Sequence, residues 1–250
     1  MPGTKPPARI FVHGHLGAGG KCALPPAQAR HVARALRLRP GDAVTLFNGD
    51  GNEYGAEIER IGKDAATLNV TGGRAVDREA PFAVTLAQAV SSGERMDYTV
   101  QKAVELGVAG IQPLVSARNV VRLREERAVK RLAHWQAVVI AACEQCGRNR
   151  VPPVEPPLEF HAWLALTAKA QDGAAKLLLS PRAADSLHRL ARPAAGVILL
   201  AGPEGGLAPE EERAAEQTGF HPVRLGPRVL RTETAAVAAL AALQALWGDF

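Results

Sequence analysis

Two short segments near the carboxyl terminus place glycine, proline and charged residues directly after an apolar run. The run 197–200 leads into Gly-Pro-Glu-Gly-Gly at positions 202–206, and the run 221–226 leads into PRVLRTET at positions 227–234. A simple turn needs only one glycine and one polar residue. The three glycines around Pro203 and Glu204 therefore predict main chain that a ligand approaches closely.

The ligand expected at these glycines is neutral or cationic. Glu204 would repel a phosphate group, and the chain lacks the glycine-rich sequences that usually hold phosphates. Cys143 and Cys146 have C-x-x-C spacing, but no second cysteine pair or nearby histidine completes a zinc set. We interpret these cysteines as small residues on a helix face and expect no metal.

The chain carries a net charge of +5 over 250 residues, and its basic residues are clustered. Segment 118–131 holds six basic and two acidic residues, and segment 30–39 holds four arginines. Such clusters suit the phosphate backbone of a nucleic acid. Either cluster alone could equally be a solvated helix face, but two clusters favour nucleic acid.

The apolar residues predict a cytoplasmic protein with no membrane partner. No run reaches the roughly eighteen apolar residues of a membrane span. The first residues also lack the apolar centre of a secretion signal.

Two patterns divide the chain into domains, predicted at residues 1–73 and 82–250 with a linker at 74–81. The first domain alternates short β-like runs with turn signals, which predicts a small β-barrel module with one helix. Its expected elements are strands at 8–12, 42–47, 52–62 and 65–73 and a helix at 25–38.

The second domain alternates strands and helices and is predicted to be α/β with a parallel sheet. Ligands of such sheets bind beyond the carboxyl ends of the strands, which is where segments 202–206 and 227–234 lie. The apolar final helix indicates burial in its own core or against another subunit. The expected strands are 82–90, 109–116, 175–181, 196–202 and 221–226, and the expected helices are 94–107, 125–145, 159–166 and 232–247.

Four motifs, in this order behind a β-rich domain, resemble the RsmE type of SPOUT RNA methyltransferases. They are QKAVELG, EQCGRNRVP, GPEGG and LGPRVLRTETA, and the resemblance covers nearly the whole chain. It implies a PUA-like domain followed by a SPOUT domain with a carboxyl-terminal trefoil knot, working as a homodimer. It also implies methylation of N3 of a uridine in 16S ribosomal RNA of the small subunit, with S-adenosylmethionine as cofactor.

The resemblance assigns cofactor contacts to the residues that match the family's motifs. A bound adenosyl group needs close main-chain approach, which glycine allows, and its sulfonium tolerates a nearby carboxylate. The assigned residues are Leu179, Ser180, Gly202, Glu204, Gly205, Gly206, Leu225, Gly226, Val229, Leu230 and Arg231.

Arg231 and Glu233 are the expected catalytic residues. The imino proton of uridine N3 has a pKa of roughly 9, so the reaction requires proton removal or stabilisation of the resulting anion. Arg231 would stabilise that charge, and Glu233 would orient Arg231 or assist in removing the proton. The alternative is that both residues only cap the last helix.

The residues expected to contact RNA are Arg9, Arg30, Arg34, Arg118, Arg122, Arg148 and Arg150. For Arg148 and Arg150 an equal alternative is charge compensation at the end of the preceding helix. Two other functions stay open: a SPOUT methyltransferase that modifies another RNA position, and a non-catalytic RNA-binding factor in ribosome assembly.

Overall fold

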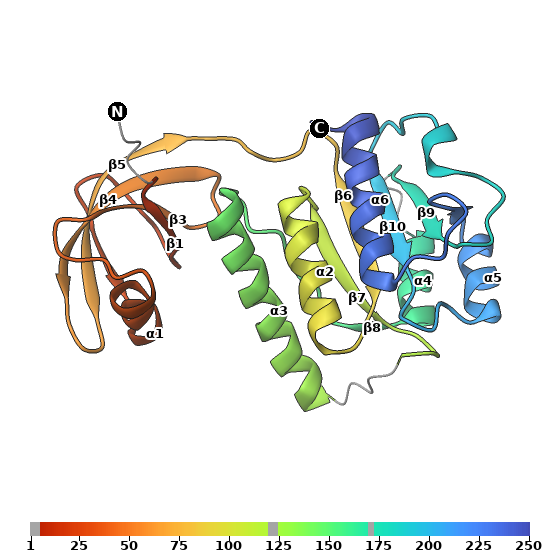
Figure 1. Cartoon of the computed structure of the whole chain (residues 1–250), viewed down its shortest axis with the longest axis horizontal. Helices are drawn as coiled ribbons and strands as arrows, with labels where there is room; N and C mark the ends of the chain where they lie inside the picture. The colour runs from red at the N-terminus through yellow and green to blue at the C-terminus, as the bar shows by residue number, and fades with distance from the viewer. Residues whose placement is uncertain (1–5, 120–124, 170–172) are drawn as a thin grey trace. The chain divides into compact units, whose positions relative to one another are not determined.

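The computed structural model describes residues 6–119, 125–169 and 173–250 (Figure 1). The chain forms two compact units, of which the first comprises Met1–Glu79 together with Cys143–Val151. The second comprises Ala80–Ala142 and Pro152–Phe250. The domain ranges expected from the sequence stay a prediction, and they differ from these units in the segment Cys143–Val151.

The first unit contains a five-stranded sheet in the order β1-β3-β4-β5-β2. β1 is parallel to β3, and the other neighbouring pairs are antiparallel. The strands predicted around residues 48–51 are confirmed as β3 and β4, whereas β2 at the sheet edge was not anticipated. The strands are β1 (Ala8–Phe11), β2 (Lys21–Leu24), β3 (Ala43–Phe47), β4 (Asn52–Ile61) and β5 (Ala66–Ala75).

Side chains alternate along these strands, so that one face of the sheet is buried. In β4, Tyr54, Ala56 and Ile58 belong to the core, while the alternate residues 55, 57 and 59 are exposed. The helix predicted at 25–38 is shorter than expected and continues as a π-helix: α1 is Pro26–Arg30 and η1 is His31–Ala35. Ala29 and Val32 of this pair pack into the same core.

The second unit contains a six-stranded sheet in the order β11-β9-β10-β6-β7-β8. Every neighbouring pair is parallel, as the continuous apolar runs predicted. The carboxyl ends of all six strands therefore meet at one edge. The strands are β6 (Val84–Ala89), β7 (Gly110–Val115), β8 (Leu158–Glu159), β9 (Ala175–Leu179), β10 (Val197–Ala201) and β11 (His221–Val223).

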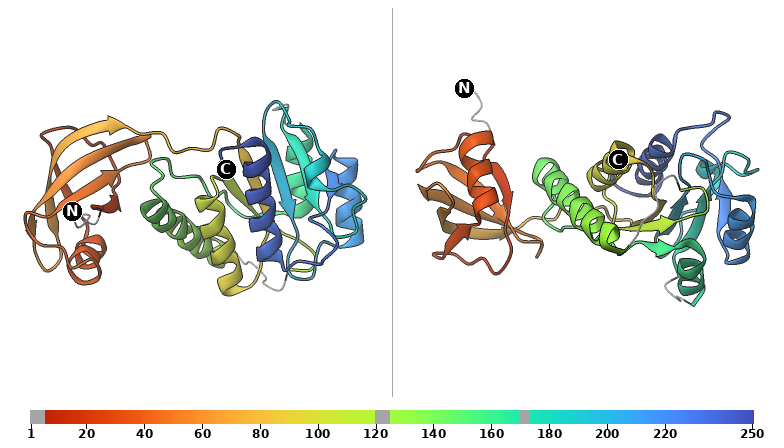
Figure 2. Two further views of the ribbon diagram at one scale, coloured as in Figure 1. Left: turned by 45° about the horizontal axis from the view of Figure 1, so that its top comes forward. Right: turned by 90° about the horizontal axis from the view of Figure 1, so that it is seen from below.

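Helices cover both faces of this sheet (Figure 2). Side chains from α4 and α5 share a core cluster with Leu178 of β9 and Leu200 of β10. α2 and α6 pack against each other, and α6 contacts β6 and β10. The helices are α2 (Gly93–Glu105), α3 (Glu125–Cys146), α4 (Phe160–Lys169), α5 (Pro209–Gln217) and α6 (Thr232–Trp247), with a 3-10 turn η2 at Leu187–Arg189.

The predicted helices at 94–107, 125–145, 159–166 and 232–247 are confirmed within a few residues. α5 was not predicted from the sequence. Within the described ranges, none of the helices has the length and apolar character needed to cross a bilayer. The threaded knot implied by the resemblance stays a prediction.

Gly196 sets the start of β10, because no other residue fits its surroundings. Its φ is 98°, and an added Cβ would lie 2.5 Å from the carbonyl oxygen of Ala83. That carbonyl accepts a hydrogen bond of 2.9 Å from the N–H of Val197, so Ala83 cannot retreat without breaking the contact. Gly219 has a similar φ of 91°, but no atom lies within 4 Å of its would-be Cβ.

We therefore expect Gly196→Ala to destabilise the protein more than Gly219→Ala. Alanine at Gly219 incurs only the left-handed backbone penalty, about 1 kcal/mol, whereas alanine at Gly196 adds a clash and costs about 3 kcal/mol. Urea unfolding of the two variants and the parent chain measures both losses. Equal losses would show that the contact with Ala83 relaxes freely.

Candidate functional site

A pocket opens at the carboxyl ends of β9 and β11. Five residues assigned to the cofactor line it: Leu179, Ser180, Leu225, Val229 and Leu230. The structure thus brings together residues from two strand ends that are more than forty positions apart. The pocket is also lined by residues that the sequence analysis did not single out, namely Pro181, Val223, Arg224, Arg228 and Ala235.

The strand pairing explains why these residues meet. Val223 lies opposite Leu179 in the parallel ladder, and the N–H of Ser180 continues the ladder with a 3.0 Å bond to the carbonyl of Val223. Val223 is the last residue of β11, whereas the sequence predicted a strand that continues to residue 226, so the sequence placed this strand end three residues too late. Val229 is 81% exposed at this pocket, unusually open for a large apolar side chain.

The glycine loop, which we define as residues 202–206, follows β10 and folds tightly on itself. A Cβ on Gly202 would lie 2.9 Å from the backbone nitrogen of Leu207. Gly206 has a φ of 68°, a conformation that favours glycine. The conformation of the loop itself therefore explains why glycine is present at both positions. The expected close approach of a cofactor to this loop stays a prediction, as does the contact assigned to Gly226, whose φ is 84°.

The carboxylate of Glu204 is bound at the start of α2. Its Oε1 accepts hydrogen bonds from the N–H of Ser92 at 2.8 Å, from its hydroxyl at 2.7 Å and from Arg95 at 3.1 Å. Burial favours the neutral acid, but these hydrogen bonds outweigh it and lower the pKa of Glu204 to about 2. Glu204 therefore stays charged at neutral pH and joins the glycine loop to α2.

Arg118 also holds the glycine loop. Its guanidinium donates to the carbonyl of Gly205 at 3.1 Å and to that of Leu207 at 3.4 Å. Arg118 is also one of the residues expected to contact RNA. That role stays a prediction, and the structure adds this contact within the second unit.

Arg231 and Glu233 lie together at the amino end of α6. Arg231 is the N-cap residue, is exposed, and makes no side-chain cap; among the described residues its guanidinium has no partner. The alternative in which the Arg231 side chain caps the helix therefore has no support. Glu233 lies in the first turn, where a carboxylate complements the helix dipole. Its Oε2 is buried and has no hydrogen-bond partner in the described part of the chain.

Arg9 and Arg148 belong to an ion network inside the first unit. Arg9 donates to Glu53 at 2.5 Å and to Asn149 at 2.6 Å, and Arg148 pairs with Glu79. Burial opposes the charge of Glu53, but hydrogen bonds and charges of Arg78 and Arg9 lower its pKa. These contacts attach the segment after α3 to the β-rich unit. RNA contact by Arg9 and Arg148 stays a prediction.

The other basic residues expected to contact RNA are exposed where the structure describes them. Arg30 pairs with Asp64 at 3.2 Å, while Arg34 on η1 and Arg150 also face solvent. Arg122 lies outside the described residues. These side chains are available to a polyanion, and their contact with RNA stays a prediction.

The two cysteines of the C-x-x-C sequence lie in the last turn of α3, as expected. Burial raises the pKa of Cys143 to about 12, so its thiol stays protonated. In the described ranges no three His, Cys, Asp or Glu side chains are grouped so that they could hold a metal ion.

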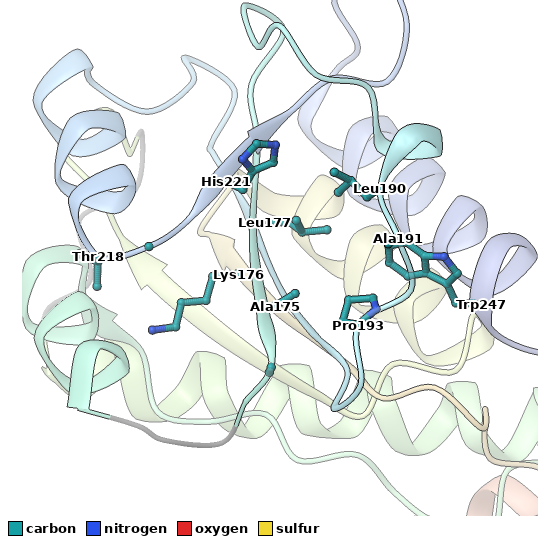
Figure 3. Close-up of a pocket in the computed structure, with 11 residues that line it drawn as sticks. Ala175, Lys176, Leu177, Leu190, Ala191, Pro193, Thr218, His221 and Trp247 are labelled. Carbon is teal, nitrogen blue, oxygen red and sulfur yellow. The ribbon is translucent and has the colours of Figure 1, made fainter.

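A larger hollow of about 470 Å³ lies at the opposite, amino ends of β9 and β11 (Figure 3). Its polar side chains are already paired within the protein. Lys176 donates to the carbonyl of Thr167 at 2.9 Å, and His221 lies 2.8 Å from Asp185. The other labelled side chains are largely apolar, including Leu190, Pro193 and Trp247. None of the residues assigned to the cofactor or to catalysis lines this hollow.

Two family descriptions match the sequence, one for each part of the chain. Residues 24–71 match the RNA methyltransferase PUA domain, and residues 78–244 match the RNA methyltransferase domain. The ribosomal RNA small subunit methyltransferase E of Buchnera aphidicola subsp. Schizaphis graminum is 33% identical over 241 residues, which are 96% of this chain and 97% of that protein.

Two solved structures resemble this chain over nearly its whole length. A ribosomal RNA small subunit methyltransferase E from Neisseria gonorrhoeae, bound to S-adenosyl methionine, is 43% identical with a TM-score of 0.89 and covers 98% of this chain and 99% of its own. A Legionella pneumophila protein in complex with the bound cofactor SAM is 40% identical with a TM-score of 0.93, at the same coverage. The chain belongs to the ribosomal RNA small subunit methyltransferase E family of RNA methyltransferases.

The Glu204 contacts predict a pH-dependent stability difference between the parent chain and Glu204→Gln. Because the folded pKa is lowered, the charged carboxylate stabilises the fold above its unfolded pKa, and this contribution is lost as the pH falls towards 2. We expect Glu204→Gln to melt several degrees lower at pH 7. Melting curves between pH 7 and pH 3.5 should show the gap narrowing below about pH 4.5. A constant gap would contradict the ionic role.

Proposed function

We propose that the chain transfers a methyl group from S-adenosylmethionine to N3 of a uridine in 16S ribosomal RNA of the small subunit. The observation that carries the proposal is the pocket at the ends of β9 and β11, which contains five of the assigned cofactor residues. Arg231 follows one wall of this pocket directly in sequence. Full-length likeness to structures that hold S-adenosylmethionine supports the same assignment.

The residues of the pocket fit an adenosyl group. Leu179, Leu225 and Leu230 provide apolar walls, and Ser180 adds a small polar side chain. Val229 would be covered by a bound nucleoside, which accounts for its high exposure here. The glycine loop ends the adjacent strand β10. S-adenosylmethionine supplies the activated methyl group when bound.

Arg231 and Glu233 perform the remaining chemistry in this proposal. The exposed guanidinium of Arg231 is free to approach O2 or O4 of the target base and stabilise the charge left when N3 loses its proton. Glu233 receives that proton or orients Arg231, since one of its carboxylate oxygens has no partner among the described residues. Methyl transfer itself requires alignment of the reacting atoms more than acid–base catalysis.

Three further assignments belong to the proposal. Residues 1–73 form a PUA-like domain that contacts RNA through the exposed cations Arg30 and Arg34, and Arg150, which follows α3, adds a third exposed cation. The chain forms a homodimer, which is supported by the 44% exposure of Leu246 on α6 and by an adjoining hollow lined largely by apolar side chains. The enzyme works in the cytoplasm, where ribosomal subunits are assembled.

The reaction is tested with purified protein, labelled S-adenosylmethionine and small ribosomal subunits that lack the modification. Digestion of the RNA and mass spectrometry should identify 3-methyluridine as the labelled nucleoside. A methylated ribose or guanine would instead establish a SPOUT enzyme with another target. If the protein binds the cofactor but forms no product, the proposed substrate is wrong. If it does not bind the cofactor, the assembly-factor alternative is favoured.

Arg231→Ala is expected to retain the fold and lose most of its turnover. Removing one group that stabilises a developing anion lowers the rate by about 100-fold or more, while an exposed side chain contributes little to stability. The matched control is Arg213→Ala, because Arg213 is exposed on α5, away from the pocket. Initial rates at saturating cofactor, together with melting temperatures, separate the two variants. Near-normal turnover of Arg231→Ala would remove Arg231 from the mechanism.

A further inference from the structure

Gln88 is a fully buried polar residue near the carboxyl end of β6, inside the sheet of the second unit. Its amide Nε2 lies 2.9 Å from the carbonyl of Ala89, 3.1 Å from the carbonyl of Gly202 and 3.1 Å from the hydroxyl of Thr232. The Thr232 hydroxyl in turn donates to the carbonyl of Gly202 at 2.6 Å. Gln88 and Thr232 therefore form a closed set of hydrogen bonds around one carbonyl oxygen.

The orientation of the Gln88 amide follows from its surroundings. Two carbonyl oxygens face Nε2, so a flipped amide would place its own oxygen against them. The Oε1 atom is buried and has no hydrogen-bond partner among the described residues. Burying a polar atom without a partner costs free energy, and an apolar side chain of similar size would avoid that cost. An apolar residue would, however, remove the donor that Nε2 provides to the carbonyls of Ala89 and Gly202, so the contribution of Gln88 lies in these contacts.

The two groups that Gln88 joins belong to the two halves of the candidate site. Gly202 is the first residue of the glycine loop, and Thr232 lies between Arg231 and Glu233 at the start of α6. These segments are thirty residues apart in sequence, and Gln88 lies more than one hundred residues before either of them. The Gln88 amide thus fixes the spacing between the proposed cofactor loop and the proposed catalytic residues.

We infer that Gln88 is a positioning residue that holds the glycine loop and the amino end of α6 in the arrangement needed to bind S-adenosylmethionine. The inference rests on the proposed function. Gln88 acts through Gly202 and Thr232 and is not expected to touch the reacting atoms. Its loss should therefore weaken cofactor binding in the folded protein.

The test compares Gln88→Met with Gln112→Met by calorimetric titration of S-adenosylmethionine. Gln112 is a matched control: it lies on the neighbouring strand β7, is 8% exposed, and its amide binds the carbonyls of Pro113 and Pro156, both at 2.9 Å. We expect at least a tenfold higher Kd for Gln88→Met and an unchanged Kd for Gln112→Met. Melting temperatures without cofactor should fall by similar amounts in both variants.

Gln88→Glu adds a readout that a purely structural role would not produce. A carboxylate at this position would repel the carbonyls of Ala89 and Gly202, whereas the protonated acid can donate one hydrogen bond. Burial raises the pKa of such a carboxyl group, so its protonated fraction increases between pH 8 and pH 6. The cofactor affinity of Gln88→Glu should therefore recover towards that of the parent chain as the pH is lowered. The pH profile is measured on folded Gln88→Glu protein, so it still tests the inference if Gln88→Met fails to fold.

Thr232→Val examines the other end of the same hydrogen bonds. We expect it to weaken cofactor binding, and we expect the double variant with Gln88→Met to lose little more than the single variants. Unchanged cofactor affinity in both Gln88 variants would overturn the inference, as would an affinity of Gln88→Glu that ignores pH. Absence of binding by the parent chain would instead contradict the proposed function.

Discussion

Parallel strand pairing is the constraint on which the candidate site depends. Because all neighbouring strands of the six-stranded sheet run in the same direction, their carboxyl ends lie at one edge. Segments that follow β6, β9, β10 and β11 meet there although they are far apart in sequence. The pairing of Val223 with Leu179 forms the floor of the pocket, and α6 returns from β11 to the middle of the sheet. Removing the parallel register would separate the cofactor residues from Arg231.

Charged residues around this edge fall into two groups with different surroundings. Glu204 is tied to the start of α2, and Arg118 is tied to the glycine loop, so both fix the conformation of the main chain. Arg231, by contrast, is exposed and has no partner in the part of the chain that is described. A side chain that already has ionic partners stabilises its surroundings, whereas an unpaired one is available to a substrate. Of these three residues, Arg231 is the one whose charged group has no partner within the described ranges, as the role proposed for it requires.

The same distinction applies in the first unit. Arg9 and Arg148 were expected to contact RNA, yet both are bound to carboxylates, Arg9 to the buried Glu53 and Arg148 to the partly buried Glu79. Their hydrogen bonds attach the segment Cys143–Val151 to the β-rich sheet. Desolvated arginines need such partners, so their charge is compensated by the carboxylates of the same network. The exposed cations Arg34 and Arg150 are the better candidates for phosphate contacts, and Arg30 is a third because its ion pair with Asp64 is open to solvent.

The sequence by itself determined the α/β class, the positions of most strands and helices, and the segments that contain the candidate site. These features depend on local periodicity and on glycine and proline, which can be recognised within a few residues. Only the tertiary structure decided which charged residues are paired, that Gln88 joins Gly202 to Thr232, and that residues after α3 pack with the first unit. Such contacts link residues from about thirty to about one hundred and forty positions apart, and no local pattern encodes which partner a buried polar group finds.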